Sequence, residues 1–230
     1  MLKELPQDLK IIGTRWVLAW KAPGVAKARL VVQGCQEKSS AIRGGAPTAS
    51  RDAMMPVCLF GSQKHWSLGQ YDAECAYLQS EGLGRSLLLR MPDPAPPTKY
   101  PGEVVAATGA IYGTKDAVRK WYFHLKAILA NHGLYESVLE KGTYRMFEDS
   151  ELIMTMHIHL LVAFGSRSKE AKSVLQTLQK SLHLNGGVKK QFEYLARLVT
   201  IPDKDITISQ AKSAKSVDLI YIDPARKKKG

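Results

Sequence analysis

The segment from Thr114 to Asn131 is the part of the chain whose local structure follows most directly from its sequence. Its apolar residues recur at helical spacing, and Gly133 follows as a C-terminal stop. The residues at that spacing are Ala117, Trp121, Leu125, Ile128 and Leu129. Strand-like segments lie before and after this helix in the sequence. Together they predict an α/β (α+β) fold.

The strand-like segments alternate in polarity or are continuously apolar. Residues 14–21 and 27–32 are expected to form a hairpin around Pro23 and Gly24, with basic residues on it. A strand from Trp66 to Tyr71 is expected to lead into Asp72, with a short helix over residues 74–80. Further strands are predicted at 86–91, 143–147, 152–158, 160–164, 193–201 and 206–209, and helices at 51–63, where Pro56 interrupts the pattern, and at 168–182.

Composition limits the class of protein and of partner. Of the 230 residues, 45% are hydrophobic and 23% are charged, which argues against wholesale disorder. Thirty-three Lys and Arg face 21 Asp and Glu, giving a net charge of +12. That excess favours polyanionic partners, nucleic acid first, although a solvated basic surface without a ligand is the alternative.

Cellular location is predicted from what the sequence lacks. Cys35, Cys58 and Cys75 are widely spaced, so no disulfide framework or zinc site is implied. The N-terminus has no apolar core of a signal peptide, and no stretch approaches the roughly 18 apolar residues of a spanning helix. We expect an intracellular, cytoplasmic protein without a membrane partner. The tail from Arg226 to Lys229 is either a nuclear import signal or a solvated terminus.

Asp72 is the first candidate for chemistry. A carboxylate that ends a buried strand before a helix is a usual mounting for one ligand of a magnesium pair, although a capping role explains a lone Asp as well. The segment from Asp72 to Leu78 resembles the Asp-x-x-x-Ala-Phe-Leu box of copia-type reverse transcriptases. The resemblance implies that Asp72 is a catalytic metal ligand and that Tyr77 is the gate that rejects a ribose 2′-hydroxyl.

A second segment, from Ile111 to Tyr122, resembles the same family's Leu-Tyr-Gly-Leu-Lys-Gln-Ala-Pro-Arg-x-Trp-Tyr. It matches at Tyr112, Gly113, Lys115, Ala117, Arg119, Trp121 and Tyr122. In the family this segment packs beside the incoming nucleotide and the template. Glycine at 113 permits close backbone approach, and Lys115 and Arg119 near a helix N-terminus suit phosphate. Asp116 replaces the family's Gln and Val118 replaces its Pro.

A third match, Lys27-Ala28-Arg29-Leu30-Val31, implies that Lys27 and Arg29 contact the triphosphate, although exposed basic residues are often only solvated. The resemblance implies a right-hand polymerase-like palm of antiparallel strands with packed helices and an N-terminal fingers hairpin. Residues 11–165 would be fingers and palm, and 166–230 a partial thumb or connection region with a basic tail. The implied activity is RNA-directed DNA polymerase, with Mg²⁺ as cofactor and an RNA template, a DNA primer and deoxynucleotides as partners.

The catalytic pair of this family is missing from the chain. Where the family carries Asp-Asp between two strands, the sequence from 157 to 162 reads His-Ile-His-Leu-Leu-Val. Either three residues were lost between His159 and Leu160, or Ile158-His159-Leu160 replaces Val-Asp-Asp. Glu151 is too distant to substitute, roughly 26 Å away at about 3.3 Å per strand residue.

His157 and His159 would share one strand face and could bind a soft metal, but imidazole poorly replaces the hard oxygens that magnesium prefers. If they bind no metal, these two histidines have no role in the chemistry. We therefore expect little or no polymerase activity. The alternatives are a non-catalytic nucleic-acid-binding remnant and a decayed element without a selected function.

Overall fold

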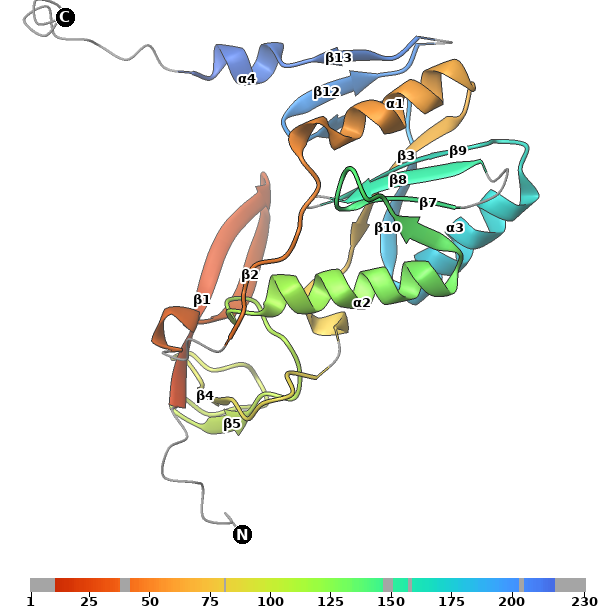
Figure 1. Ribbon diagram of the computed structural model, residues 1–230. Helices are drawn as coiled ribbons and strands as arrows, with labels where there is room; N and C mark the ends of the chain where they lie inside the picture. The colour runs from red at the N-terminus through yellow and green to blue at the C-terminus, as the bar shows by residue number, and fades with distance from the viewer. Residues whose placement is uncertain are drawn as a thin grey trace, which may run out of the picture.

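The computed structural model describes residues 11–37, 42–80, 82–146, 151–156, 159–202 and 205–217. The basic tail, His157 and Ile158 lie outside these ranges. The described part is a mixed α/β protein built on three sheets that are mostly antiparallel, as expected (Figure 1). None of its helices is both long enough and apolar enough to cross a membrane.

The N-terminal sheet begins with the predicted hairpin. Strands β1 (Ile11–Ala22) and β2 (Val25–Val32) pair antiparallel, with Thr14 opposite Val32, and Gly24 in the turn has φ +76°. Two short strands, β4 (Leu88–Arg90) and β5 (Val104–Ala106), complete the order β2-β1-β4-β5. The β1–β4 pair is parallel. The hairpin projects away from the rest of the molecule in Figure 1.

The central sheet has six antiparallel strands in the order β10-β3-β9-β8-β7-β6. Strands β8 and β9 are buried at every residue, which explains why residues 160–164 are continuously apolar. The bounds are β3 (Ser67–Ala73), β6 (Leu134–Glu136), β7 (Thr143–Met146), β8 (Leu152–Met156), β9 (Leu160–Phe164) and β10 (Leu184–Val188).

Both faces of the central sheet are covered, which is why β8 and β9 carry no polar face. On one face, Val162 packs in a cluster with Leu125 of α2 (Ala117–Asn131) and Leu178 of α3 (Lys169–Ser181). On the other face, Leu161 packs with Met54 of α1 (Met54–Gln63). That second cluster also includes residues of the small sheet β11 (Gln191–Tyr194), β12 (Arg197–Thr200) and β13 (Thr207–Ser209).

The predicted helices are present with shifted ends. Pro56 stands in the first turn of α1, where its missing N–H removes no intrahelical bond, so it does not interrupt the helix. Ser168 caps α3 by accepting a hydrogen bond from the Ala171 N–H at 3.1 Å. The predicted helix over 74–80 is a short 3₁₀ turn, η3 (Ala76–Gln79). Other short helices are η1 (Gly34–Gln36), η2 (Arg51–Ala53) and α4 (Ala211–Lys215).

Strand β10 was not predicted, because its Asn185-Gly186-Gly187 reads as a break. Gly186 has φ +137°, and a Cβ there would stand 2.1 Å from the Gln70 carbonyl oxygen. Glycine therefore lets β10 approach β3 closely enough to pair with it, with Asn185 opposite Asp72. The central sheet consequently takes strands from both sides of residue 165.

Candidate functional site around Asp72

Asp72 lies at the exposed end of β3, beside the β8–β9 hairpin. The last residue pair between β3 and β9 is Tyr71 with Leu160, which places Asp72 next to His159. The His159 Nδ1–H donates to Asp72 Oδ1 at 3.1 Å, since an ionised carboxylate can only accept. Both side chains are open to solvent, at 62% for Asp72 and 41% for His159. His159 is thus the direct neighbour of the predicted metal ligand.

The other carboxylate near this end of β3 is Glu74. Its backbone N–H donates to the His183 carbonyl at 3.1 Å, and its Oε2 accepts from Asn185 Nδ2 at 3.4 Å. Both contacts hold Glu74 against the chain around β10. In the described residues, Glu74 is therefore oriented by β10 and not by Asp72.

Tyr77, Tyr112 and Arg29 form a stack that joins the short helix η3 to the N-terminal hairpin. The ring centroids of Tyr77 and Tyr112 are 4.9 Å apart in an edge-to-face arrangement. Arg29 Cζ lies 5.3 Å from the Tyr112 ring centroid, within cation–π range. Burial raises the pKa of Tyr112, the nearby Cys75, Tyr77 and Asp72 also raise it, and Arg29 lowers it. Arg29, Tyr77 and Asp72 are thus all close enough to Tyr112 to affect its pKa.

Lys27 and Lys115 have side chains exposed to solvent. Lys27 is two residues before Arg29 on β2, so the two share one side of the strand. Lys115 uses its backbone N–H, which donates to Glu37 Oε2 at 3.1 Å and leaves the ammonium group free of that contact. Phosphate binding by these two residues stays a prediction.

Gly113 has φ +92° and sits against the end of β2. A Cβ at this position would stand 2.0 Å from the Val32 carbonyl oxygen, and the Val32 N–H donates to the Tyr112 carbonyl at 2.8 Å. The backbone at Gly113 lies close to other backbone atoms, while its contact with a nucleotide stays a prediction. Its partner is β2 of the same chain, so this glycine holds the hairpin against the loop before α2.

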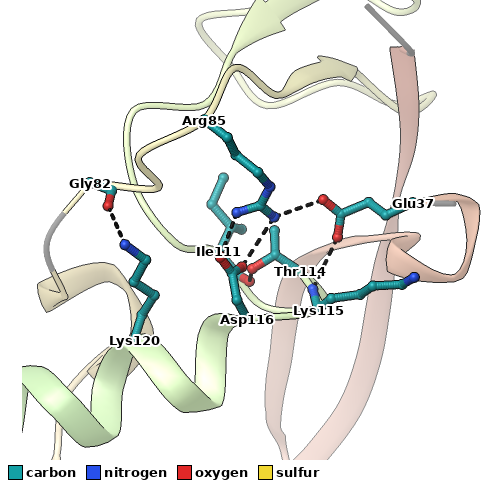
Figure 2. A network of polar contacts seen from close by, with 8 residues as sticks. All are labelled: Glu37, Gly82, Arg85, Ile111, Thr114, Lys115, Asp116 and Lys120. Atoms are coloured by element: carbon teal, nitrogen blue, oxygen red, sulfur yellow. Dashed lines mark hydrogen bonds and ion pairs between the residues drawn. The ribbon is translucent and has the colours of Figure 1, made fainter. Parts of the chain in front are cut away.

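Asp116 belongs to a polar network that the sequence did not indicate (Figure 2). Arg85 donates to Asp116 Oδ1 at 3.1 Å through Nη2 and to Asp116 Oδ2 through Nη1. Arg85 Nη2 also donates to Glu37 Oε1 at 2.7 Å. Glu37 and Asp116 are buried. Burial alone would lower the pKa of Arg85, but its bonds to Glu37 and Asp116 raise it overall. The carboxylate of Asp116, at the start of α2, is therefore paired with the positive charge of Arg85.

Arg119 lies away from the Tyr112 stack. Its Nη1–H donates to the Gly45 carbonyl at 3.2 Å, and its Cζ lies 4.8 Å from the Phe123 ring centroid. Within the described residues its contacts are with these two neighbours. A role for Arg119 beside a nucleotide at Asp72 stays a prediction.

A comparison with known protein families matches residues 1–218 to the family described as reverse transcriptase (RNA-dependent DNA polymerase). The chain belongs to the reverse transcriptase family. It is 24% identical over 183 residues to the retrovirus-related Pol polyprotein from transposon RE2 of Arabidopsis thaliana, which covers 76% of this chain and 12% of the relative. It is 22% identical over 240 residues to the corresponding polyprotein from transposon RE1, covering 91% of this chain and 16% of the relative.

These matches confirm the resemblance to copia-type reverse transcriptases. The chain spans less than a fifth of the length of the two polyproteins, at 12% and 16%.

The residues at Asp72 do not fit the pair of divalent metals that template-directed DNA synthesis by a reverse transcriptase uses. Two such ions need several hard oxygen ligands, and this site offers one carboxylate bonded to an imidazole. Among the described residues, no three His, Cys, Asp or Glu side chains gather as a metal site. The sequence from 157 to 163 adds no carboxylate.

The β8–β9 hairpin lies at the position where the resemblance would place the family's catalytic pair. Met156 pairs with Leu160, so only three residues connect β8 to β9. His159, the last of them, reaches Asp72. The central sheet therefore places the His159 imidazole beside Asp72 at this hairpin.

Proposed function

We propose that this chain is a reverse transcriptase fingers and palm that binds nucleic acid and deoxynucleotide but performs little or no templated DNA synthesis. In this proposal the central sheet with α2 and α3 is the palm, and the β1–β2 hairpin belongs to the fingers. Residues 11–165 supply the fingers and most of the palm, and α3 and β10 complete the palm, so the boundary predicted at residue 165 falls inside this layer. The rest of 166–230 is a partial thumb or connection region. The proposal rests on the family, on the Asp72 geometry and on the charge of the chain.

The contact between His159 and Asp72 carries the catalytic half of the proposal. In phosphoryl transfer, metal ions stabilise the charge on the attacking and leaving oxygens. An imidazole in place of two carboxylates removes negative charge that would hold those ions. Asp72 alone would leave most of the metals' positive charge without a counter-charge, so a metal pair would bind weakly at best.

The binding half rests on the groups around Tyr112. Arg29 and Lys27 are exposed on one side of β2, and the Tyr77–Tyr112 pair offers aromatic surface beside Arg29. Basic groups next to aromatic rings suit phosphates and bases together. The net charge of +12 adds long-range attraction for a polyanion.

Primer extension on an RNA template with Mg²⁺ tests the catalytic half. The unchanged chain is compared with a variant that carries Val-Asp-Asp inserted between His159 and Leu160, and with the same variant carrying Asp72→Ala. We expect extension only in the first variant. Extension by the unchanged chain would contradict the proposal. Extension by none of the three proteins would show that residues other than the missing pair also prevent catalysis.

Fluorescence anisotropy with a labelled primer–template tests the binding half. Affinity should fall by roughly a thousandfold between about 50 mM and about 200 mM salt if some six phosphates are contacted. Lys27→Gln with Arg29→Gln should weaken binding and reduce the salt slope by about two. Lys169→Gln with Lys172→Gln, on exposed positions of α3, is the matched control and should leave the slope close to its original value.

A further inference from the structure

The two faces of the β1–β2 hairpin differ in chemistry. On one face, Leu18 stands opposite Ala28 and Trp20 stands opposite Ala26, so this part of the face carries no charge. All four residues are exposed, Leu18 at 75% and Trp20 at 76%. Large apolar side chains that gather on an exposed surface mark a place where another molecule binds.

The opposite face of the hairpin is basic. Arg29 stands opposite Val17, and Lys27 stands opposite Ala19. Both cations are exposed and form no ion pair within the described residues. Residues 11–32 contain two further cations and neither Asp nor Glu. An acidic partner is therefore attracted to the hairpin.

Strand β2 is an edge strand of its sheet, since β1 is its only strand neighbour in the described part of the chain (Figure 1). The loop before α2 bonds to the backbone of β2 at its end, where the Val32 N–H donates to the Tyr112 carbonyl at 2.8 Å. From Val25 to Arg29 every residue is exposed. The outer N–H and C=O groups of this stretch therefore face no described strand and can pair with an added one.

Side-chain size along the apolar face leaves room at the open edge. The bulky Leu18 and Trp20 stand on β1, whereas the residues beside them on β2 are Ala28 and Ala26. Neighbouring strands lie about 4.8 Å apart, and an alanine fills little of the space above its own strand. A strand added next to β2 would extend its own large apolar side chains over the two alanines, toward Leu18 and Trp20.

The basic face sets the other half of the partner's sequence. Successive residues of a strand point to opposite faces of a sheet. A strand whose apolar residues lie beside Ala26 and Ala28 therefore has its alternate residues beside Lys27 and Arg29. Glu or Asp at those positions would form opposite-charge pairs between neighbouring strands, which stabilise a sheet. The hairpin thus suits an extended segment in which apolar and acidic residues alternate.

A second copy of the chain fits this edge poorly. An antiparallel pairing of two β2 strands would set Lys27 and Arg29 either opposite the same cations of the other copy or beside its apolar face. Like charges directly opposite each other destabilise a sheet. The net charge of +12 on each chain adds repulsion. Charge therefore favours an acidic partner over a second copy.

We propose that the β1–β2 hairpin is a docking site for another protein, which adds an extended segment of alternating apolar and acidic residues to β2 between Val25 and Val31. Main-chain bonds to the edge supply affinity, and the two faces of the hairpin supply specificity. The docked segment occupies Lys27 and Arg29, so it competes with primer–template for them. This protein partner goes beyond the proposed function and needs no catalysis.

The test uses a fluorescein-labelled peptide of about nine residues, in which Val and Glu alternate, and fluorescence anisotropy. A peptide of the same composition with Val and Glu in separate blocks is the control. The alternating peptide should bind at least about tenfold more tightly, since it alone presents one apolar and one acidic face. Equal affinity for the two peptides would overturn the proposal, because charge attraction would then suffice.

Substitution of Ala28 separates strand addition from charge attraction. Ala28→Lys raises the positive charge of the hairpin but places an ammonium group against the apolar residues of the added strand. Affinity for the alternating peptide should fall about tenfold. Unchanged or increased affinity would overturn the proposal. Ala130→Lys, at an exposed position of α2, is the matched control and should change affinity less than about twofold. Circular dichroism checks that both variants remain folded.

Hydrogen–deuterium exchange locates the bound peptide. Added protection of amides between residues 25 and 31 supports the proposal, since an added strand bonds to the outer N–H groups of β2. Protection confined to other segments overturns it. Sedimentation that shows self-association abolished by Ala28→Lys, without peptide binding, assigns the edge to a second copy and overturns it. Binding to vesicles of phosphatidylcholine and phosphatidylserine in place of the peptide assigns the apolar face to a membrane and also overturns it.

Primer–template binding separates this proposal from the proposed function. If primer–template binds through Lys27 and Arg29 while the alternating peptide does not bind, only the docking proposal fails. If the peptide binds along β2 while primer–template does not bind, only the proposed function fails.

Discussion

At Gly113 the backbone passes so close to β2 that a side chain has no room. The distance of 2.0 Å between a Cβ at this position and the Val32 carbonyl oxygen is one that real Cβ atoms do not adopt, and the φ of +92° disfavours any L-residue. Because the obstacle is backbone, no rotamer change can relieve it. Gly113 is therefore required for packing the β1–β2 hairpin against the loop before α2, whether or not a ligand binds there.

We predict that Gly113→Ala lowers the free energy of unfolding by at least about 2 kcal/mol, since backbone strain and a clash add together. Gly24→Ala is the control, because Gly24 also has a positive φ, +76°, but a Cβ there meets nothing within 4 Å. It should cost only about 1 kcal/mol. Urea unfolding measures both, and equal losses would show that the contact with Val32 is unimportant.

Strand β6 and helix α2 are joined by the carboxylate of Glu136. Its side chain is only 3% exposed and accepts bonds from Tyr122 Oη at 2.8 Å, Lys126 Nζ at 2.8 Å and the Gly142 N–H at 2.9 Å. Burial alone would raise the pKa of Glu136, but the three donors lower it overall. The same contact with Glu136 is the main cause that raises the pKa of Lys126.

A lowered pKa in the folded state makes the stabilisation by Glu136 depend on pH. It is fully present above the ordinary value of 4.5 and is lost as pH falls through the lowered folded pKa. We predict that Glu136→Gln reduces stability at neutral pH and loses less on acidification from about pH 6 to about pH 3 than the unchanged chain does. Glu170→Gln, at an exposed position of α3, should follow the unchanged chain. Parallel urea titrations at each pH would measure this, and identical slopes for all three would contradict it.

At the scale of the whole molecule, the central sheet is shared by two hydrophobic clusters. Val162 and Phe164 of β9 face the cluster with α2 and α3, while Leu161 and Ala163 face the one with α1. Tyr77 packs against both the first cluster and that of the N-terminal sheet. Loss of β9 would therefore remove packing from both layers at once.

This sharing predicts one cooperative thermal transition. Far-ultraviolet circular dichroism and tryptophan fluorescence should report the same midpoint, because Trp16, Trp66 and Trp121 are spread over the N-terminal sheet and the two clusters. A gradual loss of both signals would instead favour the decayed element without a stable fold.

The sequence predicted those elements of the fold whose own residues show a recognisable turn, periodicity or apolar run. The β1–β2 hairpin, α2 and the buried β9 each carry their own turn, period or apolar run. Strand β10 does not, because Gly186 is explained only by its approach to Gln70. Three-residue strands such as β5 and β6 are too short to show a period.

The residues of the candidate site also separate into those that the sequence predicted and those that only the fold brings together. Asp72 and Tyr77 were found from a short motif, and the structure places both near Tyr112. Glu37 and Arg85 were missed, because they are 48 residues apart in the sequence and meet only through the fold. The neighbour of Asp72, His159, follows from the register of β3 and β9, which no single segment reveals.

Strand β10 has a consequence for self-association. It covers the open side of β3, with its own outer side at the edge of the sheet. A chain shortened to end after β9 would turn β3 into an edge strand, with a row of unpaired N–H and C=O groups beside Asp72. Exposed edges of this kind recruit strands from other molecules. Gly186 of β10 thus helps to keep the molecule from aggregating through the strand that carries its candidate site.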